Sequence, residues 1–235
     1  MQLVIGNKNY SSWSMRPWVL MKQLGIPFEE IKLRFDFSEG SAYRQTVAQY
    51  TPARSVPVLV DEGFSVWDTL AITEYLAERH PAVWPASRQH RARARCLVAE
   101  MHAGFGALRN HCPMNIEARL PDVGARIWAD ERKVQQDVAR IEAAFADALA
   151  DTQADTPADT SARSGGPFLF GDFCAADAYF APVCTRLLTY ALPVSDTTRS
   201  YMQRVLAAPG VAAWIADALA EKDYLDFEEP HRKQR

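Results

Sequence analysis

Short apolar segments alternate with amphipathic ones over the first eighty residues. Residues 3–5 and 29–33 have the pattern of strands, and Trp18, Val19, Met21 and Leu24 recur at helical spacing between them. Residues 58–60 and 64–66 flank Asp61-Glu62-Gly63, which predicts a hairpin. The predicted elements are strand 3–5, helix 14–24, strand 29–33, helix 40–50, strand 58–60, strand 64–66 and helix 68–79. This order, βαβαββα, predicts an α/β unit in which helices cover a sheet.

The pattern changes after residue 80. His80-Pro81-Ala82-Val83-Trp84-Pro85 contains two prolines and predicts a linker over 81–87 between a domain of residues 1–80 and one of residues 88–235. The second domain is expected to be all-helical. Its helices are predicted at 88–110, 123–149, 174–192, 196–207 and 211–219. Residues 151–166 are Asp, Thr, Ala, Ser and Gly with no large apolar side chain, which predicts a mobile loop.

Composition and charge narrow the function classes. The net charge is −3, so no strong field for nucleic acid or an anionic membrane is expected, and the apolar runs are too short to span a bilayer. The short apolar run at the N-terminus is followed by no small-residue cleavage site, so no signal peptide is expected. The four cysteines show no metal-ligand spacing and are expected to be buried thiols in a reducing cytosol. The arginine run 88, 91, 93, 95 is expected to be a solvated face or to form interdomain ion pairs.

The first segment with candidate chemistry is Tyr10-Ser11-Ser12-Trp13-Ser14-Met15-Arg16, between the first strand and the first helix. A helix start presents free N–H groups and a partial positive charge, which favour an anion such as a thiolate. A hydroxyl there can hold the thiolate by a hydrogen bond. Alone, the segment is better explained by a serine that caps the helix.

Two further segments belong to the same domain. Val56-Pro57 precedes a strand, and a cis bond there would turn the Val56 backbone toward an extended peptide, whereas a trans proline would close a loop. Asp68-Thr69 opens the third helix, either as a cap or as a site for a carboxylate and an ammonium group. Together the three segments offer a cradle for carboxylate and amine, peptide backbone and thiol, all of which glutathione carries.

The chain resembles cytosolic glutathione transferases of the serine type, nearest to zeta-class-like bacterial members. Their Ser-Ser-Cys-Ser-x-Arg, Asn-Pro-x-x-x-Val-Pro-x-Leu and Glu-Ser motifs are similar to Ser11–Arg16, to the segment 51–59 and to Asp68-Thr69. Their Gly-x-x-(Ser or Thr)-x-Ala-Asp motif is similar to residues 171–177. The resemblance implies a thioredoxin-like N-terminal domain followed by a C-terminal helical bundle.

By resemblance, Ser11 stabilises the glutathione thiolate, with Ser12 next and Tyr10 also in competition. The same likeness implies that Val56 and Pro57 meet the cysteinyl backbone, that Asp68 and Thr69 bind the γ-glutamyl end, and that Arg54 reaches the glycyl side. It also implies that Asp177 belongs to a helix capping box. The substrate pocket is expected to take residues from Tyr10, Trp13, Met101, Phe105 and Arg109, while His102 and His111 are expected to be structural or solvated.

The expected function is a glutathione transferase that conjugates the thiolate of glutathione, its co-substrate, to a small hydrophobic electrophile. The alternatives are a glutathione-dependent isomerase or dehalogenase, similar to maleylacetoacetate isomerase, and a non-catalytic binding protein with the same fold. Trp13 stands where the zeta class has cysteine, which argues against that class's isomerase activity. A cytoplasmic homodimer without metal, nucleic acid or membrane partner is expected.

Overall fold

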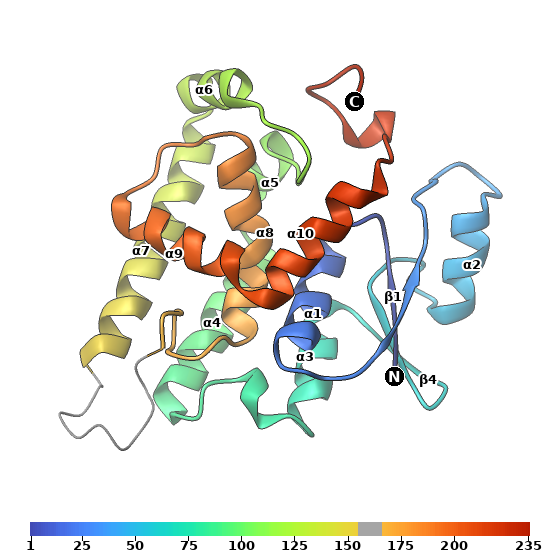
Figure 1. The fold of residues 1–235 in the computed structure, drawn as a ribbon, viewed down its shortest axis with the longest axis horizontal. Helices are drawn as coiled ribbons and strands as arrows, with labels where there is room; N and C mark the ends of the chain where they lie inside the picture. The colour runs from blue at the N-terminus through green and yellow to red at the C-terminus, as the bar shows by residue number, and fades with distance from the viewer. Residues whose placement is uncertain (155–165) are drawn as a thin grey trace.

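The N-terminal part of the chain folds around a four-stranded sheet (Figure 1). The computed structural model describes residues 1–154 and 166–235. Its strands are β1 (Gln2–Ile5), β2 (Glu29–Lys32), β3 (Val58–Asp61) and β4 (Phe64–Trp67), in the order β2-β1-β3-β4. β1 is parallel to β2 and antiparallel to β3, and β3 pairs with β4 in a hairpin. With α1 (Ser12–Gln23), α2 (Ala42–Tyr50) and α3 (Thr69–Ala77), the predicted order βαβαββα is confirmed.

Burial explains which strands are central. Leu3, Val4 and Ile5 of β1 are fully buried, because α1 and α3 cover one side of the sheet and α2 lies on the other (Figure 1). β3 is buried in the same way at Val58 and Leu59. The predicted hairpin turn has positive φ at Glu62 and Gly63, 50° and 85°, which matches the right-handed twist of its strands.

The remainder is helical, as predicted, and packs on α1 and α3 (Figure 1). After η1 (Pro81–Val83), the helices are α4 (Arg88–Ala103), α5 (Gly106–His111), α6 (Pro121–Asp130), α7 (Arg132–Ala154), α8 (Ala175–Thr189), α9 (Asp196–Ala207), α10 (Pro209–Glu221) and the 3₁₀ turn η2 (Asp226–Glu228). The predicted thioredoxin-like domain joined to a helical bundle is therefore the observed fold class.

Two predicted helices were wrong in extent. The helix expected over 88–110 is broken between α4 and α5, where Phe105 takes a left-handed conformation with φ of 55°. The helix expected over 123–149 is two helices, since Glu131, between the end of α6 and the start of α7, has non-helical φ and ψ of −109° and 82°. The side-chain amide of Gln135 donates to the Trp128 carbonyl at the end of α6. Gly104 and Gly106 flank Phe105 and signal the first break, whereas no Gly or Pro lies near the second, at Glu131.

The loop predicted over 151–166 was wrong at its start, since α7 continues to Ala154. The Thr152 hydroxyl is bonded to the carbonyls of Ala148 and Leu169, at 2.9 and 2.8 Å, which ties this helix end to the segment before α8. The rest of that prediction, residues 155–165, lies outside the described residues.

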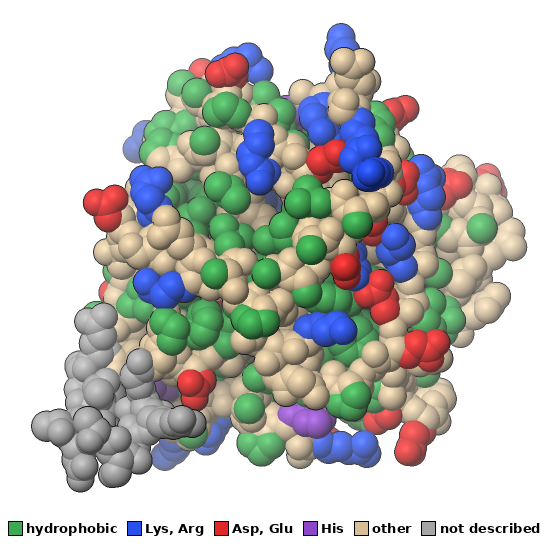
Figure 2. All heavy atoms as spheres, viewed as in Figure 1, with side chains coloured by type: hydrophobic (Ala, Val, Ile, Leu, Met, Phe, Trp, Pro, Cys, Tyr) green, Lys and Arg blue, Asp and Glu red, His purple; other side chains and the backbone are tan. Residues whose placement is uncertain are grey.

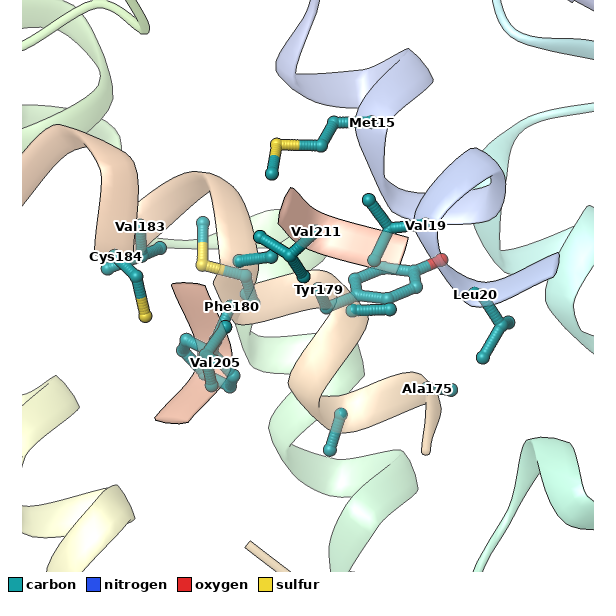
Figure 3. Close-up of a cluster of buried hydrophobic side chains, with 14 of the residues drawn as sticks. Met15, Val19, Leu20, Ala175, Tyr179, Phe180, Val183, Cys184, Val205 and Val211 are labelled. Carbon is teal, nitrogen blue, oxygen red and sulfur yellow. The ribbon is translucent and has the colours of Figure 1, made fainter. Parts of the chain in front are cut away.

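The core is continuous between the sheet and the helices. Figure 3 shows Met15 and Val19 of α1 gathered with Tyr179 and Val183 of α8 and with Val211 of α10. All five are buried. The members on α1 and on α8 are four residues apart, so each helix contributes one stripe to the contact. α1 is thus held from two sides by helices of the second domain.

Ion pairs between the two parts of the chain supplement this apolar contact. Arg95 of α4 makes a bidentate pair with Glu74 of α3 at 2.9 and 3.0 Å, which confirms an interdomain ion pair within the arginine run. Lys8, before α1, is buried and binds Glu30 at 2.7 Å and Asp217 of α10 at 2.5 Å. These contacts fix the loop that leads into α1.

The surface carries charges of both signs. Figure 2 shows Lys and Arg side chains interspersed with Asp and Glu, in keeping with the small net charge. Within residues 1–154 and 166–235, none of the helices combines the length and apolar character that crossing a membrane requires. Three of the four free cysteines are buried, but Cys96 is exposed on α4, so the prediction of a core thiol was wrong there.

Asp177 caps α8 from a fully buried position. One carboxylate oxygen accepts from the N–H of Cys174 at 3.0 Å, which completes the predicted capping box. The other accepts from the Leu169 N–H at 3.1 Å and from the Tyr201 hydroxyl at 2.8 Å. Burial raises the pKa of Asp177, and these hydrogen bonds to the ionised carboxylate oppose that rise.

Replacing Asp177 with alanine is expected to destabilise the fold strongly, because three buried donors lose their acceptor. At about 1–3 kcal/mol for each unsatisfied group, we expect a loss of at least about 3 kcal/mol in urea unfolding. Asp172→Ala, an exposed carboxylate in the same loop, is the control and is expected to change stability by less than about 0.5 kcal/mol. Similar unfolding curves for the two variants would contradict the structural role of Asp177.

Candidate functional site

Two adjoining cavities lie at the start of α1, where the sheet domain meets the helices. Their volumes are about 430 and 210 Å³, and Trp13, Ser55 and Val56 line both. Ten residues predicted for the site line one or the other: Tyr10, Ser11, Ser12, Trp13, Arg54, Val56, Pro57, Asp68, Thr69 and Arg109. The fold therefore brings together three segments that are separated by up to about sixty residues of chain.

The two candidate serines have different hydrogen bonds. Ser11 caps α1: its Oγ accepts from the Ser14 N–H at 3.4 Å and donates to the Ser14 Oγ at 2.7 Å. Ser12, the first residue of the helix, accepts a hydrogen bond from Arg186 Nη2 of α8 at 3.1 Å. Both hydroxyls lie at the helix N-terminus, where the free N–H groups favour an anion.

The Val56–Pro57 peptide bond is cis, which is the isomer that the peptide-binding interpretation requires. Val56 lines both cavities, so its backbone lies at their junction. Arg54, in the turn just before it, lines the larger cavity and has φ of 52°. This turn places backbone peptide groups and the cationic side chain of Arg54 at the cavities in front of α1.

Asp68 and Thr69 form the wall of the smaller cavity. The Asp68 carboxylate caps α3 by accepting from the Leu70 N–H at 2.8 Å, and it lies 3.3 Å from Nε2 of His102. Burial and the charges of Arg16 and Arg109 lower the pKa of His102 against the opposing effect of Asp68, so its ring is neutral at pH 7. A carboxylate only accepts, so Nε2 carries the proton and Nδ1 accepts from the Thr69 hydroxyl 3.4 Å away.

Three arginines concentrate positive charge around the start of α1. Arg16 is fully buried with its guanidinium 4.1 Å from the centre of the Trp13 ring, and its Nε and Nη1 have no hydrogen-bond partner in residues 1–154 and 166–235. Burial lowers the pKa of Arg16 to about 9 and that of Arg186 to about 10, so both remain charged at pH 7. Arg109 lies 5.3 Å from the Trp13 ring and lines the larger cavity. None of the three forms an ion pair with a carboxylate in the described chain.

Tyr10 lines the cavity, but its hydroxyl is engaged by the C-terminal segment 222–235. It donates to Glu229 at 2.8 Å, and the Leu225 N–H approaches it at 3.4 Å. Burial and the Glu229 carboxylate raise the pKa of Tyr10. Glu229 in turn accepts from Asn115 at 2.8 Å and is paired with Arg232. Tyr10 thus joins the sheet domain to the last residues of the chain.

Sequence reasoning missed several residues of the larger cavity, among them the charged Arg186 and Glu228. Arg186 comes from α8 and was indistinguishable from any other charged residue of an amphipathic helix. Glu228 comes from η2, which no pattern indicated, and burial beside Glu229 raises its pKa to about 7. Of the predicted pocket residues, Met101 and Phe105 lie in the hydrophobic core and do not line either cavity.

No group of three or more His, Cys, Asp or Glu side chains in residues 1–154 and 166–235 has an arrangement that would hold a metal ion. The groups that the structure brings to the site are two helix N-termini, three guanidinium groups and hydroxyl donors that favour anions, and one carboxylate, Asp68, that favours a cation.

Comparison with known proteins supports the same region. Residues 10–79 match the family described as the N-terminal domain of glutathione S-transferase. A dichloromethane dehalogenase of Methylorubrum extorquens is 36% identical over 61 residues, which are 25% of this chain and 20% of that protein. The mouse glutathione S-transferase theta-3 is 34% identical over 99 residues, 40% and 39% of the two chains. A rat maleylacetoacetate isomerase is 29% identical over 101 residues, 42% and 46% of the two. The chain thus spans less than half the length of these curated relatives.

Solved structures match nearly the whole chain. A glutathione transferase homolog from Burkholderia, with bound glutathione, superposes with a TM-score of 0.60 at 24% identity and covers 92% of this chain and 97% of its own. A theta-class glutathione S-transferase from Xanthomonas axonopodis pv. citri, also with glutathione, gives 0.62 at 20% identity, with 93% and 98% covered. Residues 10–79 therefore match the glutathione S-transferase N-terminal domain family, and the described part of the chain has the glutathione S-transferase fold.

Proposed function

We propose that the protein is a glutathione transferase, in which the two cavities at the start of α1 hold glutathione as co-substrate beside a small electrophile. The observation that carries this proposal is the convergence of the serine segment, Val56-Pro57 and Asp68-Thr69 on two cavities that share Trp13, Ser55 and Val56. Each segment alone has a structural explanation, as a helix cap or a loop. None of these explanations requires the three segments to meet at adjoining cavities.

The charges of the site complement those of glutathione. In the proposed arrangement, the γ-glutamyl end occupies the smaller cavity, with its carboxylate at the N-terminus of α3 near Thr69 and its ammonium group near Asp68. The cysteinyl backbone lies along Val56, and the glycyl carboxylate faces Arg54. The thiol then lies at the N-terminus of α1, where Ser11 and Ser12 are the candidate donors.

The reaction follows from the stabilised thiolate. A positive environment lowers the pKa of the thiol, and the resulting thiolate attacks an electrophile held in the larger cavity. The wall of that cavity includes Arg54, Arg109 and Arg186 as well as Pro113 and Met114, so it offers an electrophile both charged and apolar contacts. The relatives are named for different reactions: one is a dehalogenase and another is an isomerase.

A glutathione-affinity column combined with a chlorodinitrobenzene assay tests this function. We expect the protein to be retained, to elute with free glutathione, and to form the conjugate. Retention without turnover would favour an isomerase, a dehalogenase or a non-catalytic binder. Failure to be retained, with no heat change when glutathione is titrated in, would contradict the proposal as a whole.

Replacing Thr69 with valine is expected to weaken glutathione binding by about tenfold. The Thr69 hydroxyl, which lies 3.4 Å from His102 Nδ1 in the free protein, would turn to donate to the γ-glutamyl carboxylate, and one such hydrogen bond is worth about 1 kcal/mol or slightly more. Thr69→Ser retains the hydroxyl and is the matched control, with an expected affinity within about twofold of the unchanged protein. The dissociation constants are measured by calorimetry. Equal weakening in both variants would indicate that the Thr69 methyl group, and not its hydroxyl, matters.

We also propose a cytoplasmic homodimer. Phe64 and Trp67 of the edge strand β4 are 64% and 42% exposed, and an exposed apolar strand edge favours association with another chain.

Phe64→Arg is expected to weaken self-association by at least about tenfold, measured by sedimentation equilibrium, because it places a charge in the apolar contact. Leu219→Arg, which changes an exposed leucine of α10 in the same way, is the control and is expected to leave association unchanged. A single-chain mass for the unchanged protein would contradict the dimer.

A further inference from the structure

Ser12 and Arg186 meet where the contact between α1 and α8 reaches the larger cavity. Ser12 lies one turn before Met15 on the inner stripe of α1, and Arg186 lies one turn after Val183 on the facing stripe of α8. Arg186 Nη2 donates to Ser12 Oγ at 3.1 Å, and both residues line the cavity. A cation from the second domain therefore contacts a candidate thiolate donor in the first.

Packing and backbone carbonyls hold the Arg186 side chain in place. It is buried, and its Nε donates to the Cys112 carbonyl at 2.9 Å while Nη1 approaches the Pro182 carbonyl at 3.5 Å. In the described residues, no carboxylate pairs with it. A buried charge without a counter-charge is costly, so an anion bound in front of Ser12 would relieve an existing electrostatic cost.

The hydroxyl protons distinguish the two serines. Ser11 donates its proton to Ser14 Oγ, which also accepts from the Gly6 N–H at 3.1 Å. Ser12 Oγ accepts from Arg186, and its own proton has no acceptor among the residues that the structure describes. A hydroxyl that accepts a hydrogen bond from a cation becomes a stronger donor, because the two bonds polarise each other.

We propose that Ser12 is the residue that donates to the glutathione thiolate and that Arg186 is a positioning residue that orients and polarises its hydroxyl. This inference rests on the proposed function and names the donor within that site. The thiol proton leaves to solvent, the thiolate sulfur accepts the Ser12 O–H, and no bond of the protein is broken. Ser11 remains the cap of α1.

Other charged groups facing the same cavity modulate the thiolate. Arg54 and Arg109 add to the positive potential, whereas an ionised Glu228 from η2 opposes it. Tyr10 reaches the cavity too, but its hydroxyl proton is donated to Glu229.

The test is an ultraviolet titration of the thiolate of bound glutathione in the unchanged protein, in Ser12→Ala, Ser11→Ala, Arg186→Met and Ser12→Thr, and in the double variant Ser12→Ala/Arg186→Met. We expect Ser12→Ala and Arg186→Met each to raise the pKa of the bound thiol by about 1 pH unit or more, and Ser11→Ala to change it by much less. The double variant is expected to raise the pKa by clearly less than the sum of the two single shifts, because part of the effect of Arg186 acts through the Ser12 hydroxyl. Ser12→Thr, which keeps the hydroxyl, is expected to restore the low value.

Binding of S-methylglutathione, which has no thiol to ionise, separates this proposal from the proposed function. All folded variants are expected to bind it within about threefold of the unchanged protein. No binding by the unchanged protein would overturn the proposed function itself. Normal binding with an unshifted thiol in Ser12→Ala, or a shift in Ser11→Ala alone, would overturn only the assignment to Ser12.

The role of Arg186 has its own criterion. Arg186→Lys keeps the charge without the planar guanidinium. It replaces Arg186→Met in the titration if thermal melting shows that Arg186→Met does not fold. A thiol pKa in the folded Arg186 variant equal to that of the unchanged protein would overturn the positioning role. A pKa between those of the unchanged protein and Ser12→Ala would support it.

Discussion

The burial of α1 between the two parts of the chain is the constraint on which the rest of the structure depends. α1 belongs in sequence to the sheet domain, yet α8 and α10 cover it, and its residues from Ser14 to Met21 are buried. Its first turn consequently lies where the domains meet, and the helix N-terminus opens into a cavity with walls from both. The apolar contact shown in Figure 3 sets the position of the polar site at its end.

This arrangement explains why uncompensated cations are tolerated beside the site. Arg16 and Arg186 are held by packing, by aromatic rings and by backbone carbonyls, none of which cancels their charge. In a low-dielectric interior their potential is screened less than at the surface. Burying these charges destabilises the fold, and the large hydrophobic core offsets that loss. In the proposed function, the same positive potential stabilises an anionic thiolate.

The C-terminal segment completes the cavity from the other side. Glu229 receives hydrogen bonds from Tyr10 and Asn115, and Asp223 binds Asn7 and Arg34, so the segment contacts the sheet domain and the helical domain together. These bonds occupy the Tyr10 hydroxyl that sequence reasoning offered as a third candidate donor. Of the three candidate donors that the sequence offered, the two serines at the start of α1 remain for the thiol in the proposed function.

The sequence by itself determined the element order of the first domain and the residues of the three site segments, because hydrophobic period, turn residues and capping residues act within a few positions. The predicted helices ran through both breaks: the first is signalled by Gly104 and Gly106 on either side of Phe105, whereas the second, at Glu131, has no Gly or Pro near it. Only the tertiary structure decided that Arg186 meets Ser12 across 174 residues and that Glu229 meets Tyr10 across 219. Such pairs leave no local pattern, since each partner is positioned by the packing of its own helix or segment against α1 and not by its neighbours in the chain.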